Sequence, residues 1–108
     1  MKMKVPVTHP VEDLTQLHIR AAEVAKQFRD MEREAGSDTE WWLAESPELA
    51  ERLRDLTKTQ DVSLPAAMEL GRDIKRTLKT PKGDPFWELY YLGERLTELL
   101  KNQKGNQP

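Results

Sequence analysis

The strongest constraint on the fold is the spacing of the apolar residues, which recur three and four positions apart along most of the chain. Side chains at this spacing lie on one face of an α-helix, so each run predicts an amphipathic helix with one buried stripe. The first run extends over nearly three heptads, which is typical of a seam that packs along another helix. Its members are Leu14, Leu17, Ala21, Val24, Phe28 and Met31.

Three further runs repeat this spacing, and no alternation of apolar and polar residues reaches the length of a strand. The second run is Trp42, Leu49, Leu53 and Leu56. The third, weaker run is Leu64, Ala67, Gly71, Ile74 and Leu78, in which the small Ala67 and Gly71 would allow another helix to approach closely. The last is Leu89, Leu92, Leu96 and Leu99. The sequence therefore predicts an all-α fold, a small bundle of about four helices without a sheet.

Capping residues, prolines and glycines mark the predicted helix ends. Thr8-His9-Pro10 predicts one start, and Ala35-Gly36 a stop. The predicted helices are 10–34, a second from the capping box at 37–40 to residue 58 with a bend near Ser46-Pro47, 64–80, and 84–102. We expect an N-terminal extension at 1–9, one helical-bundle domain at 10–102, and a disordered C-terminal tail at 103–108.

Composition excludes several classes of protein. The chain of 108 residues contains no cysteine, so a disulfide framework, a thiolate zinc site and a cysteine nucleophile are impossible. This composition is typical of a reducing compartment, and we expect a cytoplasmic protein. We expect no membrane span, because no segment approaches the ~20 apolar residues that a span requires. We also expect no signal peptide.

Catalytic and cofactor chemistry has little support in the sequence. The only histidines are His9, at a predicted helix start, and His18, which has no acidic residue three or four positions away. Glycines are scattered singly, so no phosphate-binding loop is present. We therefore expect no catalytic residue, no metal ligand and no cofactor.

Aromatic residues provide the first functional hypothesis, because six of the seven fall in two places, the predicted starts of the second and last helices. One interpretation is a satellite core in which Trp41, Trp42, Trp87 and Tyr91 contact one another. The other is an exposed anchor for a partner protein, because Trp and Tyr are enriched in binding hot spots. The predicted partner-binding residues are Trp41, Trp42, Phe86, Trp87, Tyr90 and Tyr91.

Basic residues along the third predicted helix provide a second hypothesis. They are Arg72, Lys75, Arg76, Lys79 and Lys82. With the preceding helix and polar turn they are similar in outline to a helix-turn-helix, which would bind DNA. The alternative is a solvated helix whose last lysines complement the helix dipole.

These patterns favour a small non-enzymatic protein-binding module, an adaptor, inhibitor or regulatory factor, that uses the aromatic surface of the last helix. The alternative function is a DNA-binding regulator that uses the basic face of the third helix. A homodimer through the heptad seams of the first and last helices is also possible if those seams lack an internal partner.

Overall fold

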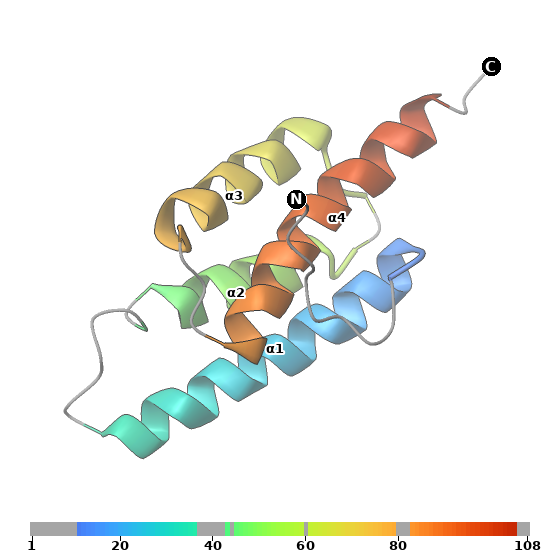
Figure 1. The fold of residues 1–108 in the computed structure, drawn as a ribbon. Helices are drawn as coiled ribbons and strands as arrows, with labels where there is room; N and C mark the ends of the chain where they lie inside the picture. Colours follow the sequence, from blue (N-terminus) through green and yellow to red (C-terminus); the bar gives the residue numbers. More distant parts are fainter. Residues whose placement is uncertain (1–10, 37–42, 44, 60, 80–82, 106–108) are drawn as a thin grey trace.

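The described residues form four helices, one for each of the predicted heptad-spaced runs, and these helices pack against one another (Figure 1). The computed structural model describes residues 11–36, 43, 45–59, 61–79 and 83–105. Its helices are α1 (Leu14–Ala35), α2 (Ser46–Leu56), α3 (Leu64–Thr77) and α4 (Asp84–Gly105). The described residues include no strand, so the predicted all-α bundle is confirmed.

Helix α1 begins at Leu14 rather than at the predicted Pro10. Asp13 is its N-cap, with extended backbone angles and a side chain that accepts a hydrogen bond from the Gln16 N–H at 2.8 Å. Aspartate is a strong N-cap because its carboxylate satisfies a free N–H in the first turn. At the other end Gly36 has a φ of 64°, and its N–H bonds the carbonyls of Glu32 and Arg33, so the predicted glycine stop is confirmed.

Helix α2 begins at Ser46, with Pro47 in its first turn. The predicted bend within a helix at Ser46-Pro47 is therefore a helix start, which suits proline because the first turn has no use for its missing N–H. Leu43 and Glu45 before it lie in turns. The predicted capping box at 37–40, and Trp41 and Trp42, lie outside the described residues.

The remaining predicted boundaries differ from the structure by a few residues. The Ser63 hydroxyl accepts a hydrogen bond from the Ala66 N–H at 3.3 Å, which confirms the predicted start of α3. Helix α3 ends at Thr77 rather than at Thr80. Helix α4 continues to Gly105, beyond the predicted end at Asn102. The predicted extension at 1–9 and the last part of the predicted tail, 106–108, lie outside the described residues.

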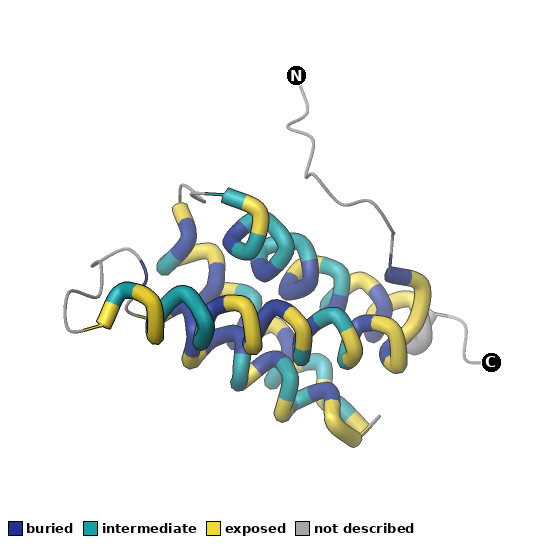
Figure 2. Tube along the Cα trace, turned by 90° about the horizontal axis from the view of Figure 1, so that it is seen from below, coloured by how far each residue is buried: buried dark blue, intermediate teal, exposed yellow. Residues whose placement is uncertain are grey.

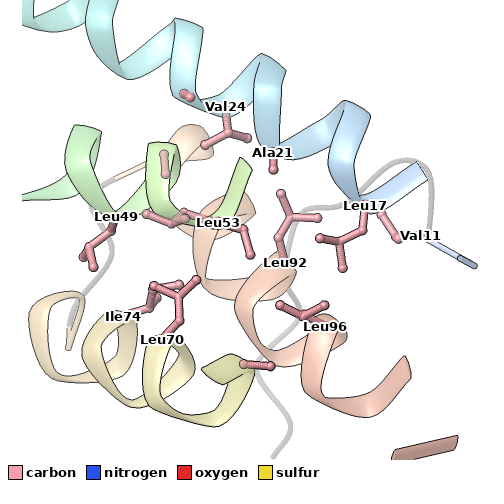
Figure 3. Close-up of a cluster of buried hydrophobic side chains, with 14 of the residues drawn as sticks. Val11, Leu17, Ala21, Val24, Leu49, Leu53, Leu70, Ile74, Leu92 and Leu96 are labelled. Carbon is pink, nitrogen blue, oxygen red and sulfur yellow. The ribbon is translucent and has the colours of Figure 1, made fainter. Parts of the chain in front are cut away.

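The core lies where the inner faces of all four helices meet (Figure 3). Along each helix, buried and exposed positions alternate with helical periodicity (Figure 2). Helix α1 packs against α2 and α4, and α3 packs mainly against α4. Leu70, which lies outside the predicted stripe of its helix, is also buried. The stripes of α1 and α4 thus pack largely within one chain, and a homodimer stays a prediction.

Gly93 of α4 lies against Ile74 of α3 where the two helices pack together. A Cβ added there would lie 2.8 Å from Ile74 Cδ1, a distance that forces a neighbour to move. At Gly71, which the sequence indicates as the point of close approach, a Cβ would meet nothing closer than Thr97 Oγ1 at 3.8 Å. The residue that permits the approach is therefore Gly93.

Two polar links fix α1 on α2. The Arg29 guanidinium donates two hydrogen bonds to the Glu51 carboxylate, at 2.7 and 2.6 Å. This bidentate pair, with Glu32 also bonded to Arg29, raises the pKa of Arg29 and lowers the pKa of Glu51. His18 Nδ1 lies 3.0 Å from the Arg54 carbonyl oxygen near the C-terminus of α2.

Among the described residues, no helix is both long enough and apolar enough to cross a bilayer.

Candidate protein-binding surface on helix α4

Phe86 belongs to the core rather than to a partner-binding surface. Its side chain is buried, and its ring packs edge-to-face on Phe28 at 4.8 Å between centroids. Phe86 lies three residues before Leu89, so it extends the inward stripe of α4 by one step. This burial weighs against the predicted contact of Phe86 with a partner.

Tyr91 is half-buried and holds the segment that precedes α1. Its hydroxyl accepts a hydrogen bond from the Val11 N–H at 3.1 Å. One turn further along α4, Arg95 Nε donates a hydrogen bond to the Val11 carbonyl at 2.7 Å, and the Val11 side chain is buried in the core. Sequence reasoning missed this Val11 clamp because a separation of 80 to 84 positions leaves no local signal.

Trp87 and Tyr90 form an aromatic pair at the start of α4. Both side chains are half-buried, and their rings meet edge-to-face with centroids 6.3 Å apart. Tyr90 packs against the core, whereas Trp87 is not among the partly buried residues of the described chain that do so. The Trp87 side chain is therefore partly exposed to solvent, and it contacts the ring of Tyr90, which packs against the core.

Of the two predicted aromatic groups, only that on α4 can be placed. Trp41 and Trp42, which the satellite-core interpretation places against Trp87 and Tyr91, lie outside the described residues. The described ring contact of Trp87 is with Tyr90 rather than with Tyr91.

The aromatic pair begins a second heptad-spaced stripe along α4, distinct from the buried one. Its members are Trp87, Tyr90, Glu94, Thr97 and Lys101. The last three line a groove of about 330 Å³ between α4 and α3, two helices that lie side by side (Figure 1). The groove is lined by Met68, Gly71, Arg72, Lys75, Gly93, Glu94, Thr97, Glu98 and Lys101.

Charges in the α3–α4 groove are only partly compensated. Lys75 Nζ lies 3.2 Å from a Glu94 carboxylate oxygen, and Glu98 is paired with Arg95 at 3.3 Å. Arg72 and Lys101 form no ion pair with any described residue. The groove therefore carries an excess of positive charge next to Met68, an exposed apolar side chain.

The basic residues of α3 are exposed as predicted, but they do not form an uninterrupted cationic face. Arg76 is paired with Asp73 at 2.8 Å, and Lys75 with Glu94. Arg72 and Lys79 are exposed, and Lys82 lies outside the described residues.

The connection between α2 and α3 does not match a helix-turn-helix. It extends from Thr57 to Ser63, which is longer than the turn of about 3–4 residues in that motif. The exposed N-terminal part of α3, the part of a recognition helix that would contact base edges, presents Met68 and Glu69. A second groove of about 420 Å³ lies between α2 and α3, with Arg52 and Glu69 in its walls. Arg52 is already bonded to Asp73 at 3.1 Å.

His18 has a structural position. Because a carbonyl oxygen can only accept, the bond to Arg54 places the proton on Nδ1. The described residues contain no group of three or more His, Asp and Glu side chains placed to hold a metal ion.

Comparison of the chain with protein-family models, with curated proteins and with solved structures finds no match.

Proposed function

We propose that this chain is a small non-enzymatic protein-binding module, such as an adaptor, inhibitor or regulatory factor, that contacts its partner through Trp87 and Tyr90. One observation carries the proposal: the Trp87 side chain is partly exposed at the start of α4, and its indole meets the ring of Tyr90 edge-to-face. Tyr90 is in turn fixed by the core beneath it.

The physical argument is that a rigid aromatic pair is a low-cost anchor. Burying the rest of an indole in a partner removes a large apolar area from water, and a tryptophan that is already held by a neighbouring ring loses little rotamer freedom. Tryptophan and tyrosine are enriched among the residues that dominate binding energy. The absence of cysteine supports a place in a reducing compartment such as the cytoplasm.

A DNA-binding regulator is the second candidate, and the exposed Arg72 on α3 and Lys79 just after its end are the observation that supports it. The long α2–α3 connection and the acidic Glu69 and Asp73 on the same helix weigh against it. Binding to phosphates alone would show a steep loss of affinity with salt, because it releases condensed counterions.

The test is affinity capture from native lysate with the full chain as bait, in nuclease-treated and untreated arms. We expect capture of a defined protein in both arms, and a loss of about tenfold or more with Trp87→Ala. Ile19→Ala is the matched control, because Ile19 is an exposed apolar residue on α1, 54% accessible. Circular dichroism confirms that both variants fold.

Two results contradict the proposal. Capture that is equal for wild type and Trp87→Ala removes the aromatic pair as the anchor. Capture that disappears after nuclease treatment favours the DNA-binding alternative.

A further inference from the structure

We propose that the partner segment is an acidic amphipathic helix that lies in the α3–α4 groove, with apolar residues on Trp87 and Met68 and carboxylates facing Arg72 and Lys101. The proposal rests on the protein-binding function above and specifies the chemistry of the partner. Three features of the groove support it.

The first feature is the spacing of the outer stripe of α4. Trp87, Tyr90, Glu94, Thr97 and Lys101 lie at steps of three, four, three and four, so these five residues share one face of α4. A stripe of this kind is complementary to the ridge of another helix, whose anchors recur at the same spacing. The aromatic pair lies at one end of this stripe, and the groove follows it over the next turns.

The second feature is the shape of the groove. Gly71 and Gly93 contribute no side chains to it, so its floor lies close to the two helix backbones. Met68 at the rim is 38% exposed, and its flexible thioether side chain can adapt to an apolar partner residue. The groove can therefore receive side chains from a helix that lies along it.

The third feature is charge. The Lys75–Glu94 and Arg95–Glu98 ion pairs cancel within the chain. Arg72 and Lys101 are left on opposite walls of the groove without an ion pair among the described residues. Lys79 adds a further exposed cation near the end of α3. Complementarity requires acidic residues on the partner, and a basic helix would place like charges together.

An acidic helix fits this surface better than a nucleic acid does. The groove is lined by the exposed apolar side chain of Met68 as well as by cations, and Glu94 and Glu98 lie in its α4 wall. Phosphates would meet those carboxylates, whereas a helix can place apolar residues beside them.

The experiment titrates the full chain with a dye-labelled helical peptide of about 18 residues, with leucines at steps of three and four and glutamates at the flanking positions. The control peptide has lysine in place of each glutamate. Fluorescence anisotropy measures affinity, and backbone amide NMR locates the contact. We expect saturable binding of the acidic peptide but not of the lysine peptide. The backbone amide signals of Gly71, Gly93 and Thr97 should shift on binding.

Variants test the groove directly. Arg72→Glu combined with Lys101→Glu should weaken peptide binding about tenfold or more, whereas Lys26→Glu with Lys58→Glu, the same charge change at exposed sites elsewhere, should leave it unchanged. Gly71→Ala should weaken binding because its methyl group fills the floor, while the fold tolerates it.

The proposal is overturned if the acidic peptide does not bind saturably, if the lysine peptide binds equally well, or if the shifts map to another face. Stronger binding of duplex DNA than of the acidic peptide also overturns it. Failure here with Trp87-dependent capture intact rejects only the acidic helix. If the acidic peptide binds but capture from lysate is unchanged by Trp87→Ala, only the aromatic anchor is rejected.

Discussion

Arg95 Nε donates a hydrogen bond to the backbone carbonyl of Val11 across 84 positions of sequence, and Tyr91 accepts from the N–H of the same residue. Both polar groups of one peptide residue are thereby satisfied by side chains of α4, while the Val11 side chain enters the core. The start of the bundle is thus attached to its last helix independently of α1.

Tyr91→Phe should lower the free energy of unfolding by about 1 kcal/mol, because it leaves the Val11 N–H without its acceptor. Denaturant unfolding measures the change. Tyr90→Phe is the matched control: no described residue bonds the Tyr90 hydroxyl, so we expect stability near that of the wild type. In a double-mutant cycle, Tyr91→Phe and Arg95→Ala should be non-additive because both bond Val11. Strict additivity would contradict a shared clamp.

Gly93→Ala and Gly71→Ala should change stability in opposite directions. The new methyl group at residue 93 would meet Ile74 Cδ1 at 2.8 Å, so we expect a loss of about 1–3 kcal/mol. At residue 71 the space is ordinary, and alanine gains about 0.5–1 kcal/mol because glycine is costly within a helix. Thermal and denaturant unfolding check both. Adding Ile74→Val, which removes Cδ1, should recover part of the Gly93→Ala loss.

His18→Ala should destabilise the chain by about 1 kcal/mol, because the Arg54 carbonyl near the C-terminus of α2 loses its donor. His18→Asn keeps an N–H donor near the position of Nδ1 and should recover part of this loss. The Thr57 hydroxyl lies 3.1 Å from Nδ1, 2.9 Å from the Leu53 carbonyl and 3.1 Å from the Arg54 carbonyl. Because a hydroxyl has one proton, Thr57 cannot fully satisfy both carbonyls once the imidazole is removed. Equal unfolding free energies for the alanine and asparagine variants would exclude the hydrogen bond as the cause.

The Arg29–Glu51 pair should make stability depend on pH. The Arg29 hydrogen bonds lower the pKa of Glu51 in the folded state, so the folded chain binds protons less readily than the unfolded chain there. The contribution is therefore present above the ordinary pKa of about 4.5 and is lost as the pH falls through the lowered value. Because both side chains are about a third exposed, we expect about 0.5 kcal/mol.

Glu51→Gln tests this contribution. Its unfolding free energy should lie below that of the wild type at pH 7, and the two curves should converge in acid. Glu69→Gln, at an exposed glutamate of α3 that forms no ion pair with any described residue, should follow the wild type throughout. A constant gap between Glu51→Gln and wild type at all pH values would contradict the assignment.

Local signals predict the helices well and the surface poorly. The stripe from Leu14 to Phe28 and the cap at Ser63 depend on residues within a few positions of each other, which the sequence displays directly. By contrast, the Val11 clamp joins opposite ends of the chain. Phe86 shows the same limit: its neighbours are aromatic, but the inward stripe of α4 and the distant ring of Phe28 determine its burial.

The α3–α4 groove combines both kinds of information. The residues of the outer stripe of α4 can be read in the sequence. The sequence does not show that this stripe lines a groove, because that depends on which side of α4 faces α3. Arg72 is visible in the sequence as a basic residue, but its place in the α3 wall of the groove depends on how the two helices align.

The contact between Gly93 and Ile74 links the packing of the core to the α3–α4 groove. Ile74 does not line the groove, but its Cδ1 fills the space that a side chain at residue 93 would need. The packing of α3 on α4 at this point therefore depends on the bulk of one buried residue. Selectivity for a partner could then be altered from the interior, by resizing Ile74, while every residue that touches the partner keeps its identity.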